Sequence, residues 1–130
     1  MKHIKLIENI YANGTSVVQL HKDTEKIKIG KGGRQSDTYS PKLFTACLEG
    51  ILRKLSWESK GINIDGDHLT HLRFADDIVL LSNYAEHLQE MLNDLNRESL
   101  KVGLKMHKGK TRVMFNDKAQ HRVIRVDNKF

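Results

Sequence analysis

Two adjacent carboxylates, Asp76 and Asp77, interrupt the chain between two strongly apolar runs, LRFA before them and IVLL after them. Each run is interpreted as a β-strand, and two strands joined by so short a link pair as an antiparallel hairpin. Side chains alternate between the faces of a strand, but at a tight turn two neighbours can project toward one site. The sequence therefore predicts a strand-turn-strand unit that carries both carboxylates at its tip.

Two helical patterns precede this hairpin. Residues 3 to 12 place their apolar side chains on one face before Asn13-Gly14 ends the pattern. Ser40-Pro41 is interpreted as the N-cap and first residue of a second helix that runs to residue 55. The single cysteine, Cys47, lies on the apolar face of that helix, so we expect a buried and unreactive thiol.

A third helix is predicted over residues 84 to 102, with Asn83 and Glu86 as a capping box at its start. Short β-like runs complete the pattern: 15–21, 25–29, 61–64, 69–75, 78–81, 112–115 and 122–126. This order predicts an α+β fold in which about three helices pack on one face of an antiparallel sheet. The chain length favours a single domain over residues 1–130, with the polar residues 117–130 poorly ordered.

The charge balance favours a polyanionic partner. The sequence contains twenty-two Lys and Arg and sixteen Asp and Glu, which gives a net charge of +6. This charge attracts polyanions over a Debye length of about 8 Å at physiological salt. On charge alone, a nucleic-acid-binding protein and a merely basic protein are equal alternatives. No apolar run approaches the ~18 residues of a membrane span, and the N-terminus lacks a signal-peptide pattern. We therefore expect an intracellular protein, in the nucleus or cytoplasm, without a membrane partner.

The chemistry of the carboxylate pair has two interpretations. Mg²⁺ takes one or two carboxylates and fills its remaining positions with water or substrate phosphates, which suits Asp76 and Asp77. Asp is also an ordinary turn residue, so a solvated turn stays open as the alternative. His68 and His71 lack further ligands at zinc spacing and are interpreted as strand-face histidines.

Three motifs extend the pattern around the pair. LTHLRFADDIVLLS resembles the [FY]-x-D-D hairpin of reverse transcriptases in the form used by non-LTR (LINE-type) retrotransposons. Upstream, GGRQSDTYSPKLF is similar to the family's R-Q-G-D-P-x-S-P-x-L-F segment, and downstream LKMHKGKT resembles L-K-x-N-x-x-K-T. The resemblance implies a partial palm domain of an RNA-directed DNA polymerase that uses Mg²⁺, an RNA template, a DNA primer and deoxynucleotide triphosphates.

The resemblance also implies roles for single residues of the hairpin and of the downstream motif. Asp76 would bind the metal ion, with Asp77 as its neighbour in the pair. Phe74 and Ala75 would form the floor of the primer end and nucleotide pocket. Lys110 would approach the triphosphate and help to neutralise or protonate the leaving group, and the alternative for it is one more solvated cation in a basic run.

The upstream motif departs from the family's pattern. Arg34, Gln35 and Ser36 would contact the nucleotide or template strand, but Ser36 replaces a Gly, Thr38 replaces a Pro, and His107 stands where the family has Asn. Two-metal chemistry needs carboxylates from more than one strand, because two divalent ions about 4 Å apart repel strongly. The family's earlier A-F-D-like motif is not in this sequence, so we expect the isolated chain to be inactive.

A non-enzymatic reading belongs to a different class of function. The chain would then be a basic module, derived from a retrotransposon, that binds RNA or DNA through phosphates or binds a partner protein. An exposed sheet edge would favour self-association. Primer extension discriminates the two readings, because only the enzyme would synthesise DNA.

Overall fold

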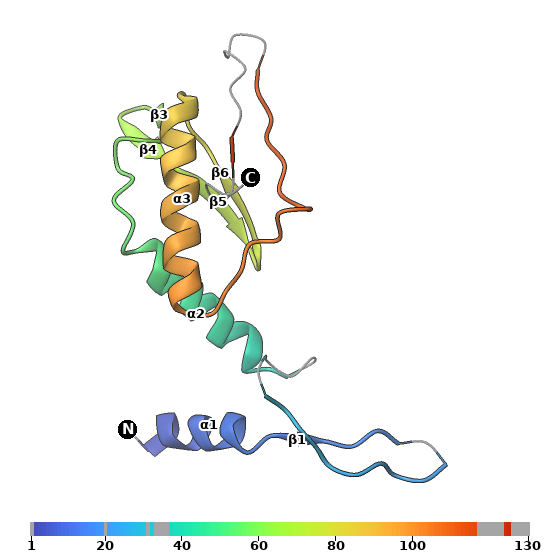
Figure 1. The fold of residues 1–130 in the computed structure, drawn as a ribbon. Coiled ribbons are helices and arrows are strands. Elements are labelled where there is room, and N and C mark those ends of the chain that lie inside the picture. The colour runs from blue at the N-terminus through green and yellow to red at the C-terminus, as the bar shows by residue number, and fades with distance from the viewer. Residues whose placement is uncertain (1, 20, 31, 33–36, 117–123, 126–130) are drawn as a thin grey trace. The chain divides into compact units, whose positions relative to one another are not determined.

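The computed structural model describes residues 2–19, 21–30, 32, 37–116 and 124–125. Its elements follow one another as α1, β1, β2, α2, β3, β4, β5, β6 and α3 (Figure 1). The predicted α+β class is confirmed. Among the described residues the strands form three two-stranded antiparallel ladders, where the sequence predicted one sheet. The chain divides into two compact units, Met1–Pro41 and Lys42–Phe130.

The first unit contains a helix and a short hairpin. Helix α1 (Lys2–Ala12) matches the predicted helix, and β1 (Thr15–Ser16) pairs with β2 (Ile27–Lys28). Toward the turn, the Val18 amide donates to Thr24 Oγ1 at 3.0 Å, and the Thr24 amide donates to the Val18 carbonyl at 3.2 Å. The predicted hairpin is therefore present, with a ladder shorter than the β-rich runs suggested.

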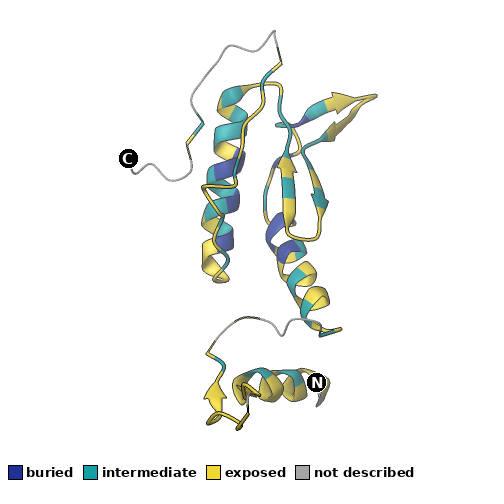
Figure 2. Ribbon diagram, turned by 90° about the vertical axis from the view of Figure 1, so that its right-hand side faces the viewer, coloured by how far each residue is buried: buried dark blue, intermediate teal, exposed yellow. Residues whose placement is uncertain are grey.

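The second unit is built around two helices and a small core. Helix α2 (Ser40–Leu52) enters this unit at Lys42, and α3 (Ala85–Lys101) contacts β6. Figure 2 shows the buried positions along α3 and at the C-terminal end of α2. The buried apolar side chains of the described residues are Leu48, Ile51, Leu52, Trp57, Met91, Leu92 and Leu95. A core of this size agrees with the modest apolar share of the sequence.

A first hairpin follows α2. Strand β3 (Ile62–Ile64) pairs with β4 (Asp67–Leu69). The two turn residues, Asp65 and Gly66, have φ values of 53° and 100°. Positive φ at both positions is the signature of a type I′ turn, for which Asp-Gly is a preferred sequence. The predicted turn at this place is confirmed.

The second hairpin carries the carboxylate pair. Strand β5 (His71–Phe74) pairs with β6 (Asp77–Leu80). Only Thr70 separates β5 from β4, and its carbonyl accepts a hydrogen bond from the Leu81 amide at 2.8 Å. The run 69–75, predicted as one strand, is therefore divided at Thr70, because the residues on either side of it pair with different strands.

Helix α3 starts without the predicted capping box. Its N-cap residue is Tyr84, in an extended conformation, and no side chain caps the helix. The Ser82 hydroxyl instead accepts from the Tyr84 amide at 3.3 Å and donates to the Lys60 carbonyl at 2.8 Å. The prediction that Asn83 caps this helix is wrong, because the chain stays extended through the following residue.

The end of α3 follows the glycine signal. Gly103 has a φ of 80°, its amide donates to the Leu100 carbonyl at 3.1 Å, and the Leu104 amide donates to the Ser99 carbonyl at 3.0 Å. This pair of hydrogen bonds is the Schellman motif, which favours glycine at the left-handed position.

Replacing Gly103 with Ala is expected to lower the free energy of unfolding by about 1 kcal/mol, because a side chain in the left-handed region costs about 1–2 kcal/mol and the stiffer unfolded chain offsets part of this. A urea titration monitored by circular dichroism measures the loss. Gly103→Asn is the matched control, because Asn tolerates this conformation and should lose less. Equal losses for the two variants would contradict the explanation.

Cys47 corrects an expectation from the sequence, since its thiol is exposed. The apolar face of α2 is covered only toward its C-terminal end, where Leu48 and Ile51 are each 3% exposed, whereas Leu43 is 40% exposed. Helical periodicity identifies the apolar face of a helix, but it does not say how much of that face a neighbour covers.

Two further β-like runs have different outcomes. Residues 112–115 form no strand, and the Arg112 guanidinium donates to its own neighbours, the Gly109 carbonyl at 2.7 Å and the Thr111 carbonyl at 3.0 Å. A β-like sequence becomes a strand only where a partner strand supplies the ladder. The run 122–126 lies mostly outside the described residues, as does most of 117–130.

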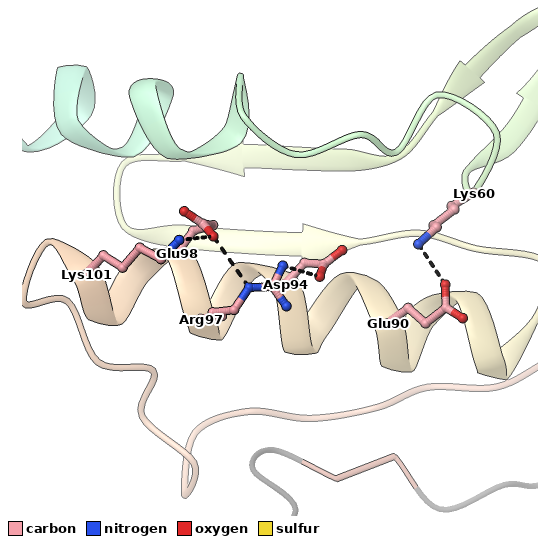
Figure 3. A network of polar contacts seen from close by, with 6 residues as sticks. All are labelled: Lys60, Glu90, Asp94, Arg97, Glu98 and Lys101. Carbon is pink, nitrogen blue, oxygen red and sulfur yellow. Dashed lines mark hydrogen bonds and ion pairs between the residues drawn. The ribbon is translucent and has the colours of Figure 1, made fainter.

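Several ion pairs lie along α3 (Figure 3). The Lys60 ammonium lies 2.7 Å from Glu90 and links the segment before β3 to this helix. Further along, four charged residues form a chain of contacts: Asp94, Arg97, Glu98 and Lys101. At least one partner of each pair is largely exposed, and solvent-screened pairs stabilise a fold only weakly, so the core carries most of the stability. Within the described residues, no helix has the length and apolar content that a membrane crossing requires.

Candidate functional site

The tip of the β5–β6 hairpin is a two-residue turn. Phe74 and Asp77 form the last pair of the ladder, so Ala75 and Asp76 make the turn itself. Ala75 has a φ of 51°, a region that costs a residue with a side chain about 1–2 kcal/mol. A tight turn thus sets the two carboxylates side by side in sequence, with one in the turn and the other at the start of β6.

The two faces of this hairpin differ in exposure. His71, Arg73, Ile78 and Leu80 are half-buried, and Ile78 and Leu80 pack against the core. The opposite face is exposed, with Leu72 at 53%, Phe74 at 84% and Val79 at 49% of their full exposure. Because side chains alternate along a strand, Asp77 belongs to this exposed face. We call Leu72, Phe74, Asp77 and Val79 the outer face of the hairpin.

Both carboxylates are available to a ligand. Asp76 and Asp77 are exposed, and neither carboxylate makes a hydrogen bond or ion pair with another described residue. No group of three or more Asp, Glu, His or Cys in the described part of the chain could hold a metal ion. Mg²⁺ needs only one or two protein carboxylates when water and phosphate complete its coordination. The pair therefore fits one divalent ion, with the described residues supplying no third ligand.

Lys110 lies in a compact turn. Its amide donates to the His107 carbonyl at 2.9 Å, and the Thr111 hydroxyl donates to the same oxygen at 3.1 Å. The Lys110 side chain is exposed and makes no hydrogen bond or ion pair with Asp76 or Asp77. The structure thus presents the cation to solvent and does not join it to the carboxylates.

The structure describes the upstream motif at Gly32 and over residues 37–44. Arg34, Gln35 and Ser36 lie outside the described residues, so their predicted roles stay predictions. Asp37 follows them, and its carboxylate accepts hydrogen bonds from the Ser40 hydroxyl at 2.9 Å and the Tyr11 hydroxyl at 3.2 Å.

Asp37 had no predicted role. The Tyr39 amide donates to its carboxylate at 3.2 Å, and this bond, followed by the Ser40 hydroxyl, lowers the pKa of Asp37. The carboxylate joins the segment before α2 to Tyr11 in the last turn of α1 and to Ser40 in the first turn of α2. An Asp three residues before a Ser-Pro helix start is the sequence signal that could have indicated this contact.

Sequence reasoning also missed an ion pair behind the hairpin. Arg73 Nη2 on β5 lies 2.8 Å from Glu49 Oε2 on α2, and Arg53 Nε lies 2.9 Å from Glu49 Oε1. The two guanidinium groups, Arg53 first, lower the pKa of Glu49. Beside them the ring of His71 meets Trp57 edge-on with centroids 6.0 Å apart, and burial lowers the pKa of His71. The only local signal is a charged residue at a half-buried strand position.

Comparisons with known proteins identify relatives of this chain. The chain is 33% identical over 98 residues to a retrovirus-related Pol polyprotein from type-1 retrotransposable element R2 of Nasonia vitripennis. The aligned region covers 75% of this chain and 10% of the polyprotein. It is 44% identical over 55 residues to an uncharacterized transposon-derived protein of Caenorhabditis elegans, covering 42% of this chain and 20% of that protein.

The chain spans a fifth or less of the length of each of these two relatives. The family comparison covers more of this sequence. The model of the reverse transcriptase (RNA-dependent DNA polymerase) family matches residues 1–125. This match includes the hairpin and the segments on both sides of it, and the chain therefore belongs to the reverse transcriptase family.

Proposed function

We propose that this chain supplies the catalytic-type hairpin of an RNA-directed DNA polymerase and that, in isolation, it binds a template–primer duplex without extending it. The observation that carries the proposal is the position of Asp76 and Asp77. Both are exposed at the tip of an antiparallel hairpin in a chain of the reverse transcriptase family. The family generally works with a divalent metal ion, and Mg²⁺ is the ion proposed for this pair.

Each residue of the site has a proposed part in the reaction. Asp76 and Asp77 would hold one divalent ion. In two-metal chemistry one ion would activate the attacking 3′ oxygen and the other would stabilise the departing pyrophosphate. Phe74, the most exposed apolar residue of the outer face, would contact the primer end, with Ala75 beside it. Lys110, exposed in its own turn, would neutralise charge on the leaving group.

The nucleotide and template contacts are proposed for the upstream motif. Arg34 and Gln35 carry donors suited to phosphates and bases, and Ser36 adjoins them. Asp37 supports this proposal, because its hydrogen bonds to Tyr11 and Ser40 fix the chain directly after these residues.

The lack of synthesis follows from electrostatics. Two unit charges 4 Å apart interact by about 1 kcal/mol in water, so two divalent ions at that distance repel about four times as strongly. Asp76 and Asp77 together offset only part of this repulsion, and the described residues bring no third ligand to the tip. We infer that the isolated chain holds one ion weakly and does not assemble a two-metal site.

Binding of nucleic acid needs less than catalysis does. Four exposed cations lie in and around the turn that contains Lys110: Lys105, Lys108, Lys110 itself and Arg112. Together with the net charge of +6, they support binding to phosphates, which depends strongly on salt.

A second candidate function is association through the hairpin. The exposed apolar side chains of the outer face, Leu72, Phe74 and Val79, support it, because such a patch favours contact with another protein or a second copy of the chain. Sedimentation velocity at increasing protein concentration separates this candidate from a monomeric nucleic-acid binder.

Two measurements on one sample test the proposal. Fluorescence anisotropy with a labelled RNA–DNA duplex should show affinity falling by about a hundredfold between about 50 and 200 mM salt if four phosphates are contacted. Primer extension on an RNA template with Mg²⁺ and deoxynucleotides should show no product.

Asp77→Asn is the control for both assays and should leave duplex binding nearly unchanged. Mg²⁺-dependent synthesis that this variant abolishes would show that the isolated chain is a complete enzyme, contrary to the proposal. Absence of binding at low salt would contradict the nucleic-acid part.

A further inference from the structure

The β5–β6 hairpin is tied to the rest of the second unit up to a definite point. Arg73 on β5 and Ile78 on β6 are cross-strand partners, and both side chains are half-buried. Ile78 packs against the core, and Arg73 pairs with Glu49 of α2. Beyond this pair every residue of the tip is exposed: Phe74, Ala75, Asp76 and Asp77.

Within the described part of the chain, the contact between Arg73 and Glu49 is therefore the last ion pair on the hairpin before the carboxylates. One residue of a strand spans about 3.4 Å, so the tip begins only that far from the Arg73–Ile78 pair. The ion pair is short, at 2.8 Å between Arg73 Nη2 and Glu49 Oε2, and the Arg73 side chain is only 24% exposed. A tie so close to the tip restricts the direction in which the tip projects.

The surroundings of the pair suit a positioning role better than a purely stabilising one. Arg73 Nη1 is buried and has no hydrogen-bond partner among the described residues, which is a cost to stability. An apolar residue at this inward-facing position would avoid that cost. Glu49 pairs with Arg73 through one oxygen and with Arg53, whose side chain is 78% exposed, through the other, so the two ion pairs can be removed separately.

We propose that Arg73 is a positioning residue, which acts through Glu49 to fix the hairpin tip, and with it Asp76 and Asp77, relative to α2. The consequence for metal binding rests on the function proposed above, because it requires these carboxylates to hold a divalent ion. The effect on the tip itself does not depend on any metal ion.

The first test is made without metal, by nuclear magnetic resonance of the ¹⁵N-labelled full chain. The amide signals of Ala75, Asp76 and Asp77 should shift and broaden in Arg73→Gln and in Glu49→Gln. Arg53→Gln is the matched control, because it removes the other ion pair of Glu49 and leaves β5 untouched. Arg73→Lys keeps the charge and should restore the signals in part.

The outcomes separate positioning from stability. If the tip signals in Arg73→Gln and Glu49→Gln match the wild type, or if Arg53→Gln changes them equally, the proposal is wrong. Thermal unfolding of each variant shows whether the fold is intact. Should Arg73→Gln fail to fold, Glu49→Gln and Arg73→Lys still decide, because one retains the arginine and the other retains the charge.

The second test uses Mn²⁺ as the probe, with paramagnetic broadening as the measure of binding. Arg73→Gln and Glu49→Gln should weaken Mn²⁺ binding by about tenfold, the lower end of what loss of a group behind the metal ligands costs. Arg53→Gln should bind as the wild type does. If the wild-type chain binds no Mn²⁺, the metal-binding function fails, while the metal-free comparison still decides whether Arg73 positions the tip.

Discussion

Replacing Trp57 with Ala is expected to lower the free energy of unfolding by about 3–5 kcal/mol, enough to unfold much of the second unit. Trp57 is 3% exposed and packs in the core with residues from both helices. The expected loss combines the hydrophobic contribution of a large ring with the cavity that it would leave. Urea unfolding monitored by far-ultraviolet circular dichroism measures this loss.

Trp57→Phe is the informative control for this prediction. The Trp57 indole Nε1 is buried without a hydrogen-bond partner among the described residues, so Phe removes an unsatisfied donor while keeping an aromatic ring in place. We expect this variant to retain most of the stability that Ala loses. If Phe is as destabilising as Ala, then the indole nitrogen has a partner in solution and this account of the core is incorrect.

Replacing Gly61 with Ala is expected to cost about 2–3 kcal/mol, at the upper end for overpacking. A Cβ at this position would lie 2.5 Å from the Leu69 carbonyl oxygen, 2.6 Å from its carbon and 2.9 Å from Thr70 Cγ2. Two of these atoms belong to the backbone of Leu69 in β4, so β3 and β4 would have to separate. Thermal unfolding of the two proteins side by side gives the size of the loss.

Gly50→Ala provides a control with the opposite sign. Gly50 lies inside α2, and a Cβ there meets no atom within 4 Å. Ala in a helix interior is favoured over Gly by about 1 kcal/mol, so this variant should be more stable than the wild type. Equal destabilisation by the two substitutions would mean that the close approach at Gly61 is not the cause.

The elements that the sequence predicted best are those with local signals. The Asp65-Gly66 turn and the end of α3 at Gly103 both depend on positive φ values that few other residues adopt. The β5–β6 hairpin was equally predictable from the sequence, because the carboxylate pair lies between two apolar runs. Periodicity and turn chemistry act within a few residues, and a sequence displays such signals directly.

What the sequence could not provide depends on contacts between distant residues. The Arg73–Glu49 pair joins residues 24 positions apart in the sequence, and the local sequence around either residue does not identify its partner. The division of the strand at Thr70 and the extended start of α3 are likewise decided by pairing and by the Ser82 hydrogen bonds. The place of the two carboxylates at a hairpin tip followed from the sequence, whereas the ion pair between β5 and α2 did not.

The exposed thiol on α2 makes the second unit suitable for site-specific labelling. Cys47 is the single cysteine of the chain and lies two residues before Glu49 on the same helix. A maleimide or nitroxide reagent would therefore attach one reporter group without any prior mutation. Because the side chain is outside the core, the reporter should leave the packing intact and give a spectroscopic reference on the helix from which movement of the hairpin can be followed.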